Sequence, residues 1–296
     1  MKKSAANIVC FGEVLWDLLP TGKVAGGAPM NVAFHANQLG VTTHMISRIG
    51  NDDLGIDLLN LLTQKGVDTS LVQIDETYPT GSVKVTLDEK GSPSYEIISP
   101  VAWDFIDVNP TIISAVHNAD AFVFGSLAAR NETTRNALLK LLESAKLKVF
   151  DVNLRSPFYN KSLIVQLLHK ADIVKMNDEE LVVIGEWLGI NDTEANTAIK
   201  IKTHFNCQQL IVTRGAEGAW LLDEKEMITA EGVSIEVQDT IGSGDSFLAA
   251  YISKMLHGES LEACLQFAAA TGAYVATQKG GTPDFTEAII WELIKK

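Results

Sequence analysis

Residues 239–256 read DTIGSGDSFLAAYISKML, and this stretch decides the fold. Its small residues Gly242, Ser243 and Gly244 form a turn that opens a helix. The apolar residues that follow recur at helical spacing and are Phe247, Leu248, Tyr251, Ile252, Met255 and Leu256. Backbone N–H groups can approach an anion closely at such a turn, and the helix dipole favours negative charge there. The stretch therefore predicts a phosphate cradle at a helix N-terminus.

Asp245 lies in the first turn of this predicted helix. The helix dipole favours its ionised form, so the carboxylate can accept a proton from an alcohol while the cradle holds a phosphoryl group. An aspartate in a first turn is also an ordinary helix cap, and the residue taken alone favours that interpretation.

A second glycine cluster lies in VAGGAPMNVAFHANQLG, residues 24–40. Gly26 and Gly27 precede an amphipathic stretch in which Pro29 and Gly40 are typical of a helix start and end. Asn31 falls in the first turn, where its amide offers both a donor and an acceptor to a polyol. A polar surface asparagine at a helix entry explains the segment equally well.

Short β-branched runs alternate with amphipathic stretches along most of the chain. The predicted strands cover 7–12, 44–50, 120–125, 148–153, 172–177 and 208–215, and the predicted helices cover 27–39, 52–66, 132–146 and 161–169, with two more before about residue 205. This alternation is typical of an α/β fold with a parallel sheet covered by helices. Neither a low-complexity linker nor an internal repeat marks a boundary, so we expect one domain over residues 1–296.

One segment breaks the alternation. Residues 80–99, TGSVKVTLDEKGSPSYEIIS, predict two strands around a turn that holds Gly91 and Pro93. Val83, Val85 and Leu87 share one face, and a small open sheet needs something to cover. We expect the hairpin to cover the substrate site, a partner subunit or both, although a hairpin that simply packs on the core remains an alternative.

Composition limits the range of functions. The chain has 37 acidic and 24 basic residues and a net charge of −13, which opposes extended contact with nucleic acid. The start, MKKSAANIVCFGE, holds neither a signal sequence nor a spanning helix, so we expect a cytoplasmic protein without membrane contact. Cys10, Cys207 and Cys264 match no metal-binding spacing and predict reduced, buried thiols.

The segments GGAPMNVA and DTIGSGDSF resemble the two signature motifs of the ribokinase-like (phosphofructokinase-B) sugar kinases. Within that family, FGEVLWDLLP (11–20) and DVNLR (151–155) are most similar to bacterial fructokinases. Two positions depart from the family pattern, because Ser243 stands where alanine is usual and Val152 stands where fructokinases commonly have proline. The resemblance implies a ribokinase-like fold, with a mostly parallel central sheet flanked by helices and a small β lid formed near 14–25 and 79–104.

The resemblance also implies roles for single residues. Asp245 becomes the catalytic base, and the backbone of Gly242, Ser243 and Gly244 becomes the anion hole. The residues implied to contact sugar hydroxyls are Asp17, Gly27 and Asn31. Those implied to contact the nucleotide are Arg155, Asn177, Thr213, Gly215, Gly218 and Ala270, with Ala269 beside Ala270 in the adenine pocket.

Metal ions follow from the same resemblance. Asn177 and Glu180 match an N-x-x-E element that helps hold the Mg²⁺ accompanying ATP, largely through water. A capping box at a helix start explains the same pair. A potassium ion is implied near the carbonyl groups of Asp239, Ile241, Ala276 and Gly280.

The implied activity is ATP-dependent phosphorylation of a sugar hydroxyl, and the resemblance favours D-fructose, phosphorylated at its 6-hydroxyl. A carboxylate of ordinary pKa suffices for Asp245, because proton transfer can come late in the reaction. The substrate alternatives are 2-keto-3-deoxygluconate and ribose, and an inactive sugar or nucleotide sensor is an alternative of another class. No P-loop motif occurs. A GDS-type hydrolase is excluded because His257 lies about 16 Å along the helix from Ser246. A homodimer through the lid is expected, since hairpin strands leave an edge that needs cover.

Overall fold

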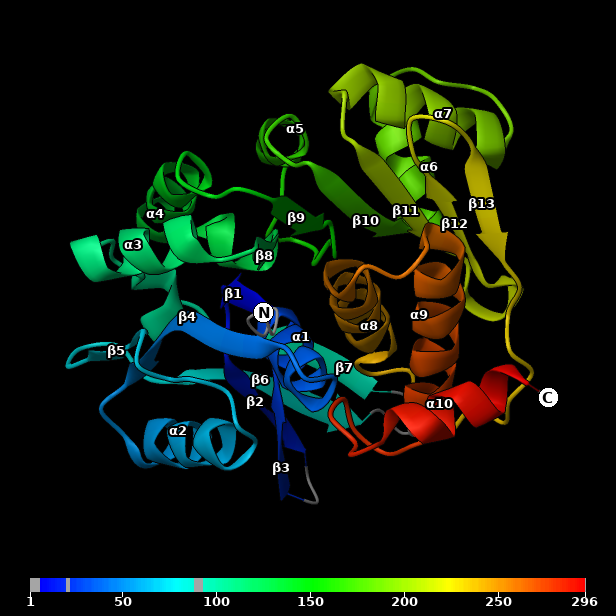
Figure 1. Cartoon of the computed structure of the whole chain (residues 1–296). Coiled ribbons are helices and arrows are strands. Elements are labelled where there is room, and N and C mark those ends of the chain that lie inside the picture. The colour runs from blue at the N-terminus through cyan, green and yellow to red at the C-terminus, as the bar shows by residue number, and fades with distance from the viewer. Residues whose placement is uncertain (1–5, 20–21, 88–92, 296) are drawn as a thin grey trace.

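A computed structural model of the chain describes residues 6–19, 22–87 and 93–295. Its centre is a sheet of nine strands in the order β13-β12-β11-β10-β9-β8-β1-β4-β5 (Figure 1). These strands are β1 (Asn7–Phe11), β4 (Thr42–Gly50), β5 (Val72–Asp75), β8 (Ala121–Gly125), β9 (Lys148–Asp151), β10 (Ile173–Asn177), β11 (Gln209–Thr213), β12 (Ala219–Leu222) and β13 (Met227–Ala230). All pairings from β11 to β5 are parallel, which confirms the mostly parallel sheet. The antiparallel edge of β12 and β13 was not predicted.

Helices cover both faces of this sheet (Figure 1). The helices on one face are α1 (Ala28–Gln38), α2 (Asp53–Gln64), α8 (Ser243–His257), α9 (Leu261–Ala276) and α10 (Glu287–Ile294). The helices on the other face are α3 (Pro110–Asn118), α4 (Glu132–Leu142), α5 (Lys161–Leu168), α6 (Asp178–Trp187) and α7 (Glu194–Phe205). Alternate residues of β1 supply the two cores, since Ile8 and Cys10 face the first layer and Val9 and Phe11 the second.

The predicted helix signals are confirmed at α1 and α8. Pro29 lies at the start of α1, and Gly40 follows its end with a φ of 80°, a conformation that favours glycine. Gly258 ends α8 in the left-handed region, with a φ of 88°.

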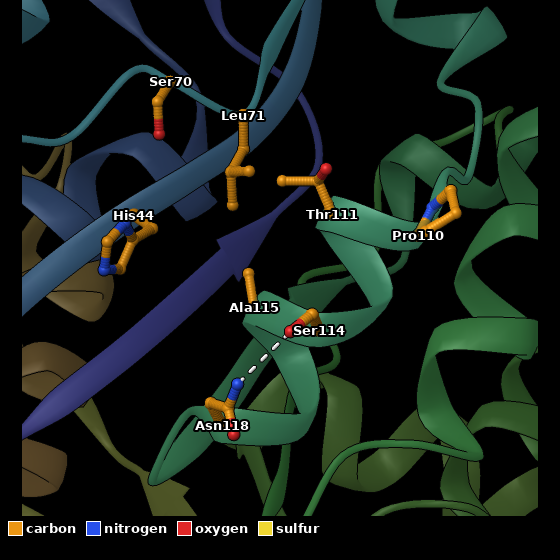
Figure 2. Close-up of a pocket in the computed structure, with 8 residues that line it drawn as sticks. All are labelled: His44, Ser70, Leu71, Pro110, Thr111, Ser114, Ala115 and Asn118. Atoms are coloured by element: carbon orange, nitrogen blue, oxygen red, sulfur yellow. Dashed lines mark hydrogen bonds between the residues drawn. The ribbon is translucent and has the colours of Figure 1, made fainter.

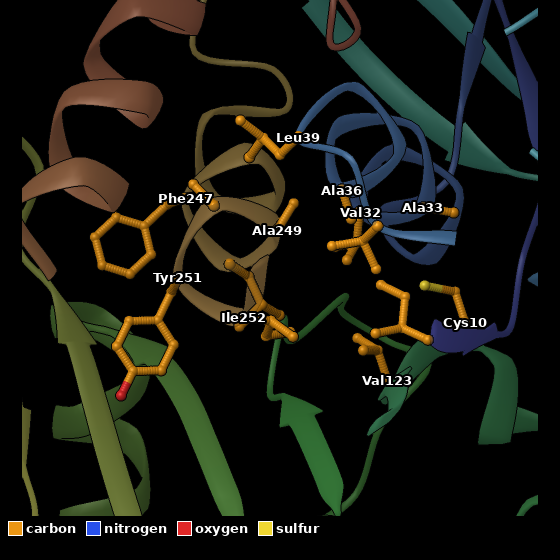
Figure 3. Close-up of a cluster of buried hydrophobic side chains, with 14 of the residues drawn as sticks. Cys10, Val32, Ala33, Ala36, Leu39, Val123, Phe247, Ala249, Tyr251 and Ile252 are labelled. Carbon is orange, nitrogen blue, oxygen red and sulfur yellow. The ribbon is translucent and has the colours of Figure 1, made fainter. Parts of the chain in front are cut away.

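Helices α1 and α8 pack directly against each other. Figure 3 shows side chains of the two helices, among them Val32 and Ala249, gathered next to Cys10 of β1 and Val123 of β8. Small residues such as Ala36 and Ala249 let the helix axes approach closely. This packing brings the two glycine clusters of the sequence together, although they are far apart along the chain.

A second sheet of four strands has the order β3-β2-β6-β7. Its strands are β2 (Leu15–Leu19), β3 (Gly22–Gly26), β6 (Gly81–Leu87) and β7 (Pro93–Ile97). The hairpin of β6 and β7 is confirmed, but β6 also pairs in parallel with β2, so of the two hairpin strands only β7 is a sheet edge. The hairpin therefore leaves one edge, at β7, as expected. Val83 and Val85 are buried as expected, whereas the side chain of Leu87 lies outside the described residues.

Two further expectations concern the whole chain. Cys10, Cys207 and Cys264 are free thiols and all three are buried, as predicted. None of the helices within 6–19, 22–87 and 93–295 is long and apolar enough to cross a membrane.

Candidate active site

The predicted cradle lies at the start of α8. Gly242 is the residue before this helix, with a φ of 75°, and a Cβ atom there would collide with the backbone carbonyl of Gly281. Ser246 donates the first hydrogen bond of the helix, 2.8 Å to the Gly242 carbonyl. The N–H groups of Gly244 and Asp245 precede that bond and have no partner within the helix. The turn can therefore present backbone donors to an anion.

Ser243 has a structural task in this turn. Its hydroxyl donates a 2.9 Å hydrogen bond to the Gly272 carbonyl, which joins α8 to α9. Its N–H donates a longer bond of 3.3 Å to the Thr240 carbonyl. Ser243 thus contributes to holding the turn, whereas, among the described residues, no hydrogen bond occupies the N–H groups of Gly242, Gly244 and Asp245.

Asp245 is surrounded by charged and polar groups. The Asn31 side chain donates a 2.7 Å hydrogen bond from Nδ2 to Oδ2 of Asp245. Burial, followed by the negative charge of Asp151, raises the pKa of Asp245 to about 6, although Asn31, Lys175 and Arg155 oppose that rise. An ordinary pKa would suffice for a late proton transfer, but burial raises the pKa of Asp245 above its ordinary value.

Asp151 and Lys175 form a buried ion pair beside the cradle. Lys175 Nζ lies 3.1 Å and 3.2 Å from the two carboxylate oxygens of Asp151. Burial lowers the pKa of Lys175, but the charges of Asp151, Glu180 and Asp245 raise it above its ordinary value. Sequence reasoning missed this pair. The available signal was a lysine in the middle of the otherwise apolar strand IVKMN.

Glu13 is a second buried carboxyl near Asp245 that sequence reasoning missed. Only 3% of its surface is exposed, and its Oε2 atom has no hydrogen-bond partner. Burial raises the pKa of Glu13 to about 7; the charge of Asp245 adds to the rise, and backbone groups and Arg155 oppose it. The available signal was a glutamate directly after a strand in FGEVLWD.

The three residues implied to contact the sugar lie close to Glu13 and Asp245. Asp17 is on β2, and a Cβ atom at Gly26 would lie 2.9 Å from its Oδ2, so glycine leaves room for the carboxyl. Gly27 has a φ of 119° and packs against the carbonyl of Glu13. Asn31 is buried, and its Oδ1 has no partner. The Asp17 carboxyl can accept hydrogen bonds, Gly27 lets a ligand approach the backbone, and the Asn31 amide oxygen is unpaired. These groups can bind the hydroxyl groups of a polyol.

The charge of Arg155 acts on the carboxyls around the implied sugar site. This positive charge lowers the pKa values of Glu13, Asp17 and Asp245, although the Arg155 side chain itself is exposed. Two cations of the first half of the chain pair elsewhere, since Lys23 pairs with Asp57 and Arg48 lies 2.7 Å from Asp75.

Asn177 and Glu180 form the capping box that the sequence also allowed. Asn177 Oδ1 accepts a 2.8 Å hydrogen bond from the Glu180 N–H, and Glu180 Oε2 accepts one of 2.9 Å from the Asn177 N–H. Glu180 Oε1 accepts a further bond of 2.7 Å from the N–H of Leu154. The structural interpretation of this pair is therefore confirmed. Both carboxylate oxygens already have a backbone partner, and any metal contact must use their remaining lone pairs.

The residues implied to contact the nucleotide divide into two groups. Thr213 ends β11, and Gly215, with a φ of 53°, has open space around its Cα. Gly218 is required for packing, because a Cβ atom there would collide with the Ala230 carbonyl. Ala270 is buried in this structure, whereas Ala269 beside it is partly exposed.

Two loops bring the residues implied in potassium binding together. Asp239 accepts hydrogen bonds from the N–H groups of Ile241 at 3.0 Å and Gly280 at 3.1 Å. The Ala276 carbonyl accepts bonds from the N–H groups of Gln238 and Asp239. In the described part of the chain, no group of three or more His, Cys, Asp or Glu side chains could hold a metal ion.

A separate cavity lies away from this site. It has a volume of about 550 Å³ and lies between β4 and α3, where Figure 2 shows His44, Leu71 and Thr111 around it. None of the predicted site residues lines it. The hydrolase alternative is also excluded by the structure, because Ser246 is buried and donates its hydroxyl hydrogen to the Ser243 carbonyl, while His257 ends α8.

The fold and the site together define an α/β phosphotransferase: a helix N-terminus supplies anion-binding N–H groups, and an adjacent carboxyl can take a proton from an alcohol. The chain belongs to the pfkB family of carbohydrate kinases, whose family model matches residues 6–288.

Individual relatives agree with this membership. The chain is 32% identical to probable fructokinase-3 of Arabidopsis thaliana over 93% of its own length and 87% of that protein. It is 29% identical to fructokinase-2 of Solanum lycopersicum, over 95% of this chain and 93% of that one.

Solved structures share the fold. Fructokinase from Xylella fastidiosa with bound ATP superposes with a TM-score of 0.85 at 25% identity, over 98% of each chain. Fructokinase from Vibrio cholerae O395, bound to fructose, ADP and calcium, gives a TM-score of 0.85 at 24% identity, over 99% of this chain and 100% of that one. The ribokinase-like fold and the class of carbohydrate kinase are therefore confirmed.

Proposed function

We propose that this kinase transfers the γ-phosphoryl group of ATP to the 6-hydroxyl of D-fructose. The observation that carries the proposal is the hydrogen bond between Asn31 and Asp245. It connects α1, where the sugar would bind, to α8, which begins with the cradle. The choice of fructose is supported by the relatives named fructokinase, which match nearly the whole chain.

In this mechanism the chain positions two substrates and moves one proton. The unpaired N–H groups of Gly244 and Asp245 bind the charged phosphoryl oxygens, and Asp17, Gly27 and Asn31 orient the sugar. Asp245 accepts the proton of the attacking hydroxyl. A pKa of about 6 leaves it mostly ionised at pH 7 and makes it a stronger base than an exposed aspartate.

Metal ions fit the charges of the site. The charges of Asp151, Glu180 and Asp245 all act on the buried cation Lys175, so negative charge exceeds positive charge there, although the described carboxyls form no group that could hold an ion directly. Asn177 and Glu180 would help hold Mg²⁺ through water, and the ion would neutralise charge on the nucleotide phosphates. A potassium ion would use the carbonyls near Asp239, Ile241, Ala276 and Gly280.

The nucleotide would extend from the cradle toward the end of β11. Thr213, Gly215 and Gly218 lie in that turn, and the partly exposed Ala269 replaces Ala270 as the candidate contact on α9.

The substrate is tested by kcat/KM for fructose, ribose, glucose and 2-keto-3-deoxygluconate under one set of conditions. We expect fructose to be best by at least about tenfold, which is about 1.4 kcal/mol of transition-state binding. A smaller preference, or another best sugar, would contradict the assignment of fructose and leave the carbohydrate kinase class unchanged.

One observation favours 2-keto-3-deoxygluconate as the second candidate. Arg155 lies near Asp17 and Glu13, and an arginine in the acceptor pocket can pair with a substrate carboxylate. Asp17 and Glu13 already supply negative charge around it, which favours a neutral sugar. The same sugar panel separates the two candidates.

The four-stranded sheet is the proposed lid and the proposed dimer contact. Its edges are β3 and β7, and an exposed strand edge readily pairs with another chain. We expect a homodimer through one of these edges and closure of the sheet over the sugar. A monomeric mass in solution at micromolar concentration would remove the dimer.

A further inference from the structure

The ion pair between Asp151 and Lys175 is one of two pairs that connect β9 and β10. At the carboxyl ends of the strands, Lys175 contacts both oxygens of Asp151 and both side chains are at least nine-tenths buried. At the amino ends, Lys148 Nζ lies 3.3 Å from Asp172, and both side chains are more than a fifth exposed. Burial of an ion pair carries a desolvation cost, so the pair at the carboxyl ends is not explained by stability alone.

Lys175 touches the cradle itself. A Cβ atom at position 244 would lie 2.9 Å from Lys175 Nζ and 3.8 Å from its Cε. The ammonium group therefore occupies the space beside the Gly244 backbone that a side chain would fill in any other residue. Because Asp151 holds Nζ from the opposite strand, the lysine cannot move aside without losing its partner.

The charges around Asp245 come from several elements. Lys175 is the buried cation among them, and Asp151 is the negative charge with the largest effect on Asp245. The charged groups that act on Asp245, on Lys175 or on Glu13 are Glu13, Asp151, Arg155, Lys175, Glu180 and Asp245 itself, and Asn31 supplies a neutral donor. Lys175 and Asp151 therefore act on Asp245 with opposite signs.

We propose that Lys175, held in place by Asp151, is a positioning residue for phosphoryl transfer: it supports the Gly244 backbone and sets the charge around Asp245. The proposal rests on the assigned role of Asp245 as the base. It adds a requirement for a lysine in the middle of β10, and it gives Gly244 a second reason to lack a side chain.

The test compares the acidic limb of the pH profile of kcat/KM in two single variants. Lys175→Met leaves Asp151 unpaired beside Asp245, so the limb should move to higher pH. Asp151→Asn removes a negative charge that disfavours ionisation of Asp245, so the limb should move to lower pH. We expect shifts of at least about half a pH unit in opposite directions, and a loss of kcat of about tenfold or more in Lys175→Met, with sugar KM changed less than about threefold.

The matched control is Lys148→Met, which removes the other lysine between the same strands. It should leave the limb and kcat unchanged. Damage to the strand pairing alone would lower activity in both lysine variants without opposite shifts, and that result would overturn the proposal. If Lys175→Met does not fold, the double variant Asp151→Asn, Lys175→Met removes both charges; wild-type turnover in it would equally overturn the proposal.

Asp245→Asn separates this proposal from the one it rests on. If that variant keeps near-normal turnover and the same acidic limb, the base assignment itself fails. If it loses turnover while the Lys175 and Asp151 variants show no opposite shifts, only the positioning role fails.

Discussion

Asn31 and Asp245 are 214 positions apart in sequence, and the amide Nδ2 of Asn31 donates a 2.7 Å hydrogen bond to the carboxylate Oδ2 of Asp245. A single contact thus connects the residue that would orient the sugar with the residue that would take its proton. Because the bond favours the ionised carboxylate, a sugar substrate that moves Asn31 also changes the basicity of Asp245.

Replacing the base without changing its shape tests the central assignment. Asp245→Asn should lower kcat by roughly 10²–10⁴-fold, the usual contribution of a positioned general base. Nucleotide binding should be nearly unchanged, because the backbone N–H groups of the cradle remain. Steady-state kinetics and nucleotide titration measure the two effects, and near-normal turnover would falsify the assignment.

The same variant should be more stable than the wild type at high pH. The pKa of Asp245 is about 6 in the folded protein against an ordinary 3.8, so the fold binds the proton more tightly than the unfolded chain does. The resulting stabilisation is complete below pH 3.8 and is lost as pH rises through about 6. Ionised Asp245 therefore costs about 3 kcal/mol at pH 8, at roughly 1.4 kcal/mol per pH unit.

Urea unfolding of wild type and Asp245→Asn at pH 8 and pH 5 measures this cost. The advantage of the variant should fall to about half between the two pH values, because Asp245 gains its proton in the folded state first. An advantage that does not depend on pH would show that the pKa is not raised.

Asn31→Leu removes the amide and nearly preserves the volume. A hydrogen bond to a charged group is worth about 1.5–3 kcal/mol, so kcat/KM should fall about 10–100-fold. The acidic limb should also move to higher pH, since the lost donor no longer favours the ionised Asp245. Asn37→Leu on the same helix is the control, because Asn37 donates to the Gly66 carbonyl at 3.0 Å and takes no part in the site. Equal losses in both variants would indicate damage to α1 instead.

Glu180→Gln separates a metal role from a capping role. The variant should lose stability, because Glu180 accepts backbone hydrogen bonds from Asn177 and Leu154. If the residue also helps hold Mg²⁺, the activating metal concentration should rise more than sugar KM does. Asn160→Ala removes the N-cap of α5, where Asn160 accepts from Leu163, and serves as a control that loses a cap alone. An unchanged metal titration would leave Glu180 with capping only.

Much of the fold could be predicted from local pattern. The strands KVFD and IVKMN and the helices that follow them carry their own hydrophobic periodicity, and the turn before α8 carries its own glycine signal. The four-stranded sheet was predicted in part, because the hairpin is a local motif. Its parallel pairing with β2 joins segments far apart in sequence, and no local signal specifies such a register.

The site residues that were missed share one physical feature. Lys175, Asp151 and Glu13 matter because burial and mutual charge change their properties, and burial depends on packing from several elements. The raised pKa of Asp245 has the same origin. A sequence motif states which groups are present, whereas the dielectric environment around them appears only when the sheet and both helix layers are assembled.

Arg155 provides the last test, since the resemblance implies a phosphate contact and the structure places its charge near Glu13, Asp17 and Asp245. If Arg155 serves the acceptor side, Arg155→Gln should raise sugar KM by about 10–100-fold, the loss of one hydrogen bond to a charged group, with ATP KM unchanged. The acidic limb should move to higher pH, because a cation that favours ionised Asp245 is removed. Arg135→Gln on α4 is the control and should change neither constant. A rise in ATP KM with normal sugar KM would instead assign Arg155 to the transferred phosphate.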